Sequence, residues 1–167
     1  GDPEQVVGEY ESLNRRREAG ALKREWGTGE VKLCEVALQD EAGRPADSFR
    51  GGGSLQARIG YRAERRITEP VFGFAIATRE GHVLYGNNTE NEGLRIPSVS
   101  GEGSVTLRID GLSLAEGTYL LSFSVHSADH KTNYHRLDNA VAIKVTSERN
   151  FEGCYMPCRW SREEARE

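Results

Sequence analysis

The sequence is poor in the features that mark membrane, secreted and nucleic-acid-binding proteins. It has three cysteines, one methionine and only four lysines among its 22 basic residues. No apolar run reaches the length of a transmembrane helix, and no charged-then-apolar signal peptide opens the sequence. The formal net charge of -4 argues against nucleic-acid partners, which require a basic surface. We therefore expect a cytoplasmic chain that binds no nucleic acid.

The few cysteines and histidines do not form a metal-binding motif. Cys154 and Cys158 lie close together in CYMPC, but a structural zinc site needs four ligands and no second pair exists. We expect ordinary thiols there and at the remaining cysteine. Three histidines lie near two aspartates, without a spacing that fixes them around one ion: His126, His130, His135, Asp129 and Asp138. We expect no metal and no cofactor.

Catalytic signatures are absent as well. The sequence has no GxxxxGK[ST] phosphate loop, HExxH pair, GxSxG elbow or GxGxxG turn. The three consecutive glycines at 51–53 lack the following lysine and helix of a phosphate loop. We therefore expect a chain that is not an enzyme.

What the sequence does have is a long β pattern, centred on residues 70–89. Large apolar residues alternate there with small ones, in the order Phe72, Gly73, Phe74, Ala75, Ile76 and Ala77. A period of two over such a run is typical of a central strand whose large side chains face the core. Residues 79–81 are predicted to turn the chain into a returning strand at 82–85. Small residues in mid-strand leave a shallow floor on which a ligand can lie.

Shorter segments of the same period follow one another along most of the chain. The expected strands cover residues 30–38, 47–50, 54–61, 104–109, 118–127 and 140–145, with a polar loop at 128–139. The alternation slips near Cys34, which indicates a bulge. The segment from Asp110 to Tyr119 has the spacing of the corner before a late strand of immunoglobulin-like domains. We predict an all-β, immunoglobulin-like antiparallel β-sandwich.

The first residues follow a different pattern. Asp2 is a suitable N-cap and Pro3 a suitable first helical residue. An apolar stripe at helical spacing follows, made of Val6, Val7, Tyr10 and Leu13. Because a strongly charged run comes next, we expect a helical linker at residues 1–25, entering from an absent upstream domain. The sandwich is then expected at residues 26–167.

A candidate binding face can be assembled from side chains that point away from the predicted core. Its floor would hold Gly73, Ala75, Ala77, Ser122, Ser124 and His126, and its rim Arg58, Arg79, Asn87, Asn88 and Tyr134. Sugars are bound by such mixtures, since amides and hydroxyls match their hydroxyl groups and an aromatic ring covers their apolar faces. An ordinary solvent-facing sheet could show the same residues, so the pattern alone leaves both interpretations open.

The β segments resemble the C-terminal domain of Wzt, the ATPase subunit of ABC transporters that export lipopolysaccharide O-antigen. The resemblance lies in FRGGGSLQARIGYRAERRITEPVFGFAIATREGHVLYGNNT, GEGSVTLRIDGLSLAEGTYLLSFSV and AVAIKV, and it covers residues 30–145. The opening GDPEQVVGEY is similar to the end of that family's nucleotide-binding domain. The motifs are β patterns without catalytic signatures, and their order and spacing are fairly specific.

The resemblance implies a carbohydrate-binding module that recognises the capped non-reducing end of a lipid-linked O-antigen polysaccharide and couples chain termination to export. It also implies a homodimer, a transmembrane transporter subunit as partner, and a place at the cytoplasmic face of the inner membrane. The ATPase motifs of the full-length family are absent, so this chain should not hydrolyse ATP. The alternative is a structural dimerisation domain that does not touch the glycan.

Overall fold

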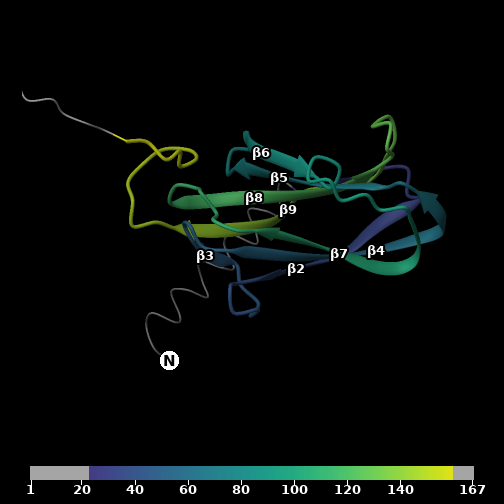
Figure 1. The fold of residues 1–167 in the computed structure, drawn as a ribbon, viewed down its shortest axis with the longest axis horizontal. Coiled ribbons are helices and arrows are strands. Elements are labelled where there is room, and N and C mark those ends of the chain that lie inside the picture. Colours follow the sequence, from purple (N-terminus) through teal and green to yellow (C-terminus); the bar gives the residue numbers. More distant parts are fainter. Residues whose placement is uncertain (1–22, 160–167) are drawn as a thin grey trace, which may run out of the picture.

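Two β-sheets packed face to face make up the computed structural model, which describes residues 23–159 (Figure 1). The larger sheet has the order β1-β9-β8-β5-β6 with β3 added beside β9, and the smaller sheet has the order β2-β4-β7. The strands are β1 (Arg24–Trp26), β2 (Val31–Gln39), β3 (Ser48–Arg50), β4 (Leu55–Thr68), β5 (Val71–Thr78), β6 (Val83–Asn88), β7 (Ser98–Ile109), β8 (Gly117–His126) and β9 (Asn133–Thr146). The predicted all-β, immunoglobulin-like sandwich is confirmed.

The helix predicted at the start of the chain lies almost entirely outside the described residues. Its last two residues, Arg24 and Glu25, instead belong to β1, which pairs with β9. Within residues 23–159 there is no helix with the length and apolar character needed to cross a membrane.

The bulge predicted near Cys34 is confirmed, and it positions a contact between the two sheets. The register of β2 against β4 shifts between Leu33 and Glu35. The Leu33 N–H donates to Nδ1 of the buried His135 on the opposite sheet, at 3.0 Å. Since Nδ1 accepts this bond, Nε2 carries the hydrogen, and it lies 3.0 Å from the Glu25 carboxylate. The buried imidazole is thus satisfied at both nitrogens.

The loop predicted at 128–139 is shorter than expected, because its second half forms the beginning of β9. His135 and Leu137 are buried, whereas Arg136 and Asp138, which alternate with them along the strand, contact Trp26 on β1. The alternation of apolar and polar residues was not recognised in this segment because the inward position 135 holds a histidine and not an apolar residue.

The predicted immunoglobulin-like corner is also present. The Tyr119 hydroxyl donates to the Ala115 carbonyl at 2.8 Å, four residues upstream. Burial raises the pKa of the Tyr119 phenol above its ordinary value. This bond fixes the turn that leads into β8.

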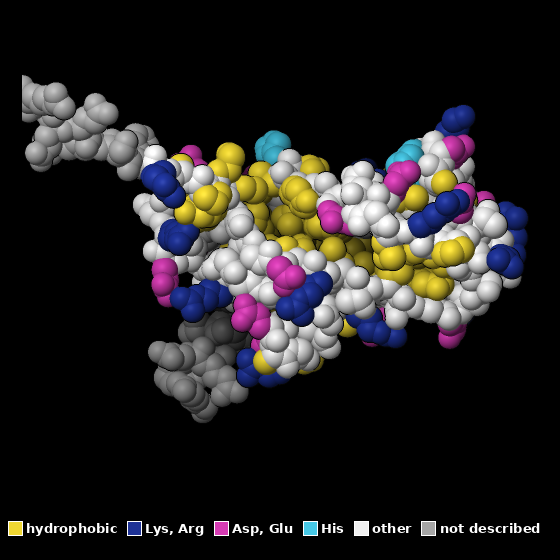
Figure 2. Space-filling view, viewed as in Figure 1, with side chains coloured by type: hydrophobic (Ala, Val, Ile, Leu, Met, Phe, Trp, Pro, Cys, Tyr) yellow, Lys and Arg dark blue, Asp and Glu magenta, His cyan; other side chains and the backbone are white. Residues whose placement is uncertain are grey.

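The two sheets separate along the edges formed by β6 and β7. On β4 the inward residues Leu55 and Ile59 are buried, but on β7 the inward Val105, Leu107 and Ile109 remain half-exposed. A cleft of about 510 Å³ opens there. Figure 2 shows it as a hollow lined with hydrophobic side chains between the two layers.

Because of the cleft, the inward-facing phenylalanines differ in how much they should contribute to stability. Phe123 is 1% exposed in the centre of the core, whereas Phe74 faces inward but is half-buried at the cleft. We expect Phe123→Ala to lower the free energy of unfolding by about 3–5 kcal/mol and Phe74→Ala by clearly less. Urea unfolding of the two variants measures this difference, and equal losses would contradict the open cleft.

Candidate functional site

The outer face of the larger sheet carries a shallow depression of about 190 Å³. It lies over β5, β6, β8 and β9. Its floor is formed by small and polar residues: Gly73, Ala75, Ser122, Ser124, His126 and Arg136. The predicted neighbours β5 and β8 are indeed paired, with Ala75 opposite Ser122 and Gly73 opposite Ser124. The small-residue floor inferred from the sequence therefore exists.

Strand register extends this floor into a row that crosses the sheet. Gly73 pairs with Asn88 on one side and with Ser124 on the other. Ser124 pairs with Arg136, which in turn pairs with Trp26 on β1. Directly opposite residues of neighbouring strands share a face. The outer face therefore holds, in line, an amide, a gap, a hydroxyl, a guanidinium and an indole.

The gap in this row depends on Gly73. A Cβ atom at this position would lie 2.8 Å from the Ser124 Oγ and 3.4 Å from the Asn87 carbonyl oxygen. Such a contact with Oγ is shorter than side chains tolerate, so the absence of a side chain at Gly73 leaves room for the Ser124 hydroxyl.

Ser122 has a structural role within the floor. Its Oγ accepts a hydrogen bond from the Asn139 N–H at 2.9 Å. Asn139 has a positive φ of 53° and lies where the register of β8 against β9 shifts. The hydroxyl thus satisfies a backbone donor that the bulge removes from the ladder, and its own hydrogen can still be donated to a ligand.

His126 closes one end of the depression. Its Nδ1 lies 2.9 Å from the Ser127 carbonyl oxygen, which places the hydrogen on Nδ1 and leaves Nε2 as an acceptor in the neutral ring. The ring packs against that of His130 in a tilted arrangement, with centroids 4.6 Å apart. His130 in turn contacts the Glu90 carboxylate at 2.7 Å. The β8–β9 turn is therefore tied to the loop after β6.

Trp26, Arg136 and Asp138 form a cluster at the other end. The Trp26 Nε1 donates to one Asp138 oxygen at 2.8 Å, and Arg136 donates to the other at 3.2 Å. The guanidinium also lies 5.5 Å from the indole centroid, within cation–π range. The aspartate neutralises the arginine, and the indole remains 47% exposed.

Four of the residues proposed from the sequence do not line the depression, and a fifth, Asn87, borders it with its side chain turned away. Arg58 is on the smaller sheet, 3.9 Å from Glu35, because β4 belongs to the other layer. Arg79 lies in the turn after β5, away from the residues that line the depression. Ala77 is buried beside Leu120.

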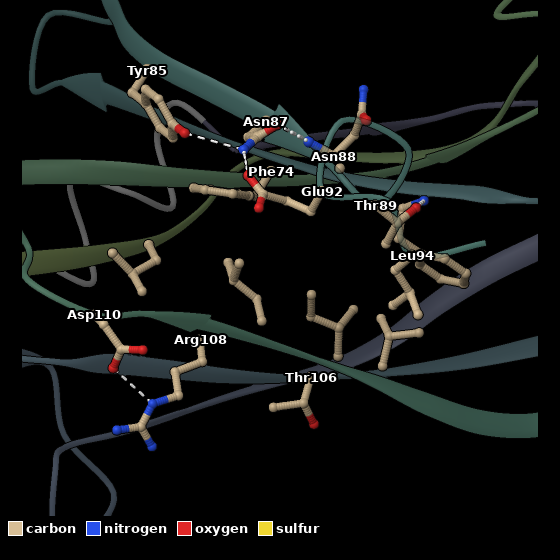
Figure 3. A pocket seen from close by; sticks show the side chains of 16 residues that line it. Phe74, Tyr85, Asn87, Asn88, Thr89, Glu92, Leu94, Thr106, Arg108 and Asp110 are labelled. Atoms are coloured by element: carbon tan, nitrogen blue, oxygen red, sulfur yellow. Dashed lines mark hydrogen bonds and ion pairs between the residues drawn. The ribbon is translucent and has the colours of Figure 1, made fainter. Parts of the chain in front are cut away.

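The side chains of Tyr134 and Asn87 point away from the depression. Tyr134 packs against the hydrophobic core, and burial raises the pKa of its phenol. Asn87 borders the depression, but it pairs with the inward Phe74, and its side chain points into the inter-sheet cleft (Figure 3). Asn88 points away from the cleft, and its Oδ1 accepts the Asn91 N–H at 2.9 Å.

Sequence reasoning missed Trp26 and Arg136, the two residues that complete the row. Trp26 follows a stretch predicted as helix, and Arg136 lies in the segment predicted as loop. The tryptophan itself, followed by Gly27, is the signal that the sequence offers for this end of the face.

The cysteines and histidines of the described residues do not form a metal-binding cluster. Of the residues 23–159, no three or more His, Cys, Asp or Glu side chains are placed to hold one metal ion. Cys34, Cys154 and Cys158 are exposed, and none of them forms a disulfide.

The fold and the face define an immunoglobulin-like β-sandwich domain with a polar depression on its larger sheet. The family model described as the Wzt C-terminal domain matches residues 23–156, and the chain belongs to that family. Among solved structures, it is similar to the C-terminal domain of Wzt, at 24% identity and a TM-score of 0.73, over 84% of this chain and 89% of that chain.

A weaker likeness is to a Niemann-Pick type C2 protein from Japanese carpenter ant. The identity is 4% and the TM-score 0.49, over 74% of this chain and 99% of that chain. No curated protein matches the chain.

The contact between Gly73 and Ser124 generates a prediction. Gly73→Ala should force the Ser124 side chain to another rotamer and destabilise the domain, whereas the same change in a Ser124→Ala background should cost less. We expect a coupling free energy of about 1 kcal/mol in the double-mutant cycle. Additive effects in urea unfolding would show that the two residues do not constrain each other.

Proposed function

We propose that this domain is a non-catalytic carbohydrate-binding module of an O-antigen ABC transporter that recognises the capped non-reducing end of the lipid-linked polysaccharide. The observation that carries the proposal is the in-register row from Asn88 to Trp26 across the outer face. Membership of the Wzt C-terminal domain family supports the transporter context.

The chemistry of the row suits a sugar. The exposed indole of Trp26 offers an apolar plate against which the C–H face of a pyranose can lie. Beside it, the Ser124 hydroxyl, the His126 Nε2 and the Asn88 amide supply both donors and acceptors. The gap at Gly73 lets the ring approach the backbone closely.

The charge of the face favours a neutral terminal residue. Arg58 and Arg79, which could have bound an acidic cap, lie away from the depression. Arg136 borders it, but its guanidinium already binds Asp138. An acidic cap would have to compete with this carboxylate, so neutral hydroxyl-rich or methylated sugars fit better.

A full-length protein of this kind would work as a homodimer beside a transmembrane subunit at the cytoplasmic face of the inner membrane. The second candidate function, a dimerisation domain without glycan contact, is favoured by one feature. The edge strand β6 exposes Val83 and Tyr85, at 69% and 48%, and unprotected edges invite pairing with another copy.

Trp26→Ala tests the proposal. Because a wet polar site with few anchors gains little, we expect sub-millimolar affinity for the cognate capped glycan. Loss of the aromatic plate should weaken it about tenfold or more. Isothermal titration calorimetry measures the change, with the uncapped glycan as the ligand control.

Val83→Ala is the matched control variant, since it removes an exposed apolar side chain from β6 instead. It should leave glycan binding unchanged. Full binding by the Trp26 variant would refute the proposed face. No binding by the wild-type domain, together with a dimer that Val83→Ala weakens in sedimentation, would favour the assembly function.

A further inference from the structure

The cleft between the sheets is an unfilled part of the sandwich interior. Elsewhere in the core, inward side chains such as Leu55 and Ile143 have no exposed surface. Along β7, Val105 and Leu107 face inward yet stay half-exposed, because β6 does not close over them. An apolar hollow of about 510 Å³ leaves hydrophobic surface in contact with water, which is unfavourable unless something occupies it.

The walls have the shape and composition of a small-molecule site. Ligand pockets measure about 300–1,000 Å³ and are lined mainly by apolar and aromatic side chains. The Phe74 and Tyr85 rings form one wall, with centroids 5.8 Å apart. Leu94, 55% exposed, closes the end opposite to Asp110 in Figure 3. Such a space accepts an alkyl chain or a flat ring system.

The mouth adds a few polar groups with a net negative charge. The Asn87 Nδ2 donates to the Tyr85 hydroxyl at 3.1 Å and to the Glu92 carboxylate (Figure 3). Arg108 and Asp110 pair with each other at 2.8 Å, and this bond lowers the pKa of the Asp110 carboxyl. Of the three charged residues that line the cleft, Glu92 is therefore the one in excess.

We infer that this cleft binds a neutral amphiphile, an alkyl chain or fused-ring hydrocarbon that ends in a hydroxyl group. The apolar walls take the hydrocarbon, and the Glu92 carboxylate accepts the hydroxyl hydrogen at the mouth. The same carboxylate repels an anionic head group such as a carboxylate or phosphate. This site is separate from the outer face and does not depend on the proposed function.

Matched probes test the inference on the full chain. N-Phenyl-1-naphthylamine is neutral, and 1-anilinonaphthalene-8-sulfonate has the same aromatic body with a sulfonate. The neutral probe should bind with one saturable site per chain, and the anionic probe about tenfold more weakly because of Glu92. 1-Decanol should displace the neutral probe, whereas decanoate at pH 8 should not.

Three variants locate the binding. Leu94→Ser removes an exposed wall residue from a surface loop, so the fold should survive, and decanol affinity should fall about tenfold. Val83→Ser, a change at an exposed apolar residue outside the cleft, should have no effect. Glu92→Gln keeps a group that can bind Asn87 but removes the charge. It should weaken decanol binding modestly, because an amide oxygen is a weaker acceptor than a carboxylate, and raise decanoate affinity about tenfold.

Three results would overturn the inference. The first is a Leu94→Ser variant that binds decanol as tightly as the wild type. The second is a wild-type preference for the anionic over the neutral probe, or several probe molecules per chain. The third is a stable dimer in sedimentation that binds no probe, since the cleft would then be an interface between two copies.

Discussion

The register of β8 against its two neighbours determines where the central polar side chains of the outer face lie. Side chains alternate along a strand, so a slip of one residue would turn Ser124 inward and Phe123 outward. On the β9 side, the register absorbs a bulge at Asn139, whose N–H is satisfied by Ser122. On the inner face of β9, the His135 imidazole accepts a hydrogen bond across the core from the backbone of the bulged strand β2. The site thus depends on two irregularities that polar side chains stabilise.

The β5–β6 hairpin separates two hollows of opposite character. Gly73 and Asn88 face outward and leave a shallow polar depression, whereas Phe74 and Asn87 face the apolar cleft. Both hollows exist because side chains or backbone that would fill the space are missing. On the outer side a glycine replaces a side chain, and on the inner side β6 stops short of covering β7. The β5–β6 hairpin therefore lines both hollows.

The period of two predicted the sandwich, the bulge at Cys34 and the pairing of the small-residue face with Ser122 and Ser124. These features follow from local alternation, which the chain shows clearly. The alternation could not predict on which sheet Arg58 lies, because an outward-facing residue alternates with inward-facing ones in the same way on either sheet. Nor could it separate Asn87 from Asn88, since the register shift in β6 decides which of the two faces out.

Trp26 was beyond a local reading for a different reason. Its place is set by the pairing of β1 with β9. These strands are far apart in the sequence: Trp26 and Asp138, which are hydrogen-bonded, are separated by 112 residues. No local pattern marks a strand of three residues. The aromatic plate of the face is therefore a product of the tertiary fold.

The central claim is that the outer face, and not the cleft, binds the glycan. The most direct measurement is a chemical-shift titration of the labelled domain with the cognate capped glycan and an uncapped control. The account predicts shifts at the Trp26 indole, Gly73 and Ser124 with the capped glycan alone. Shifts confined to Leu94 and Leu107 in the cleft, or no shifts at any ratio, would contradict it.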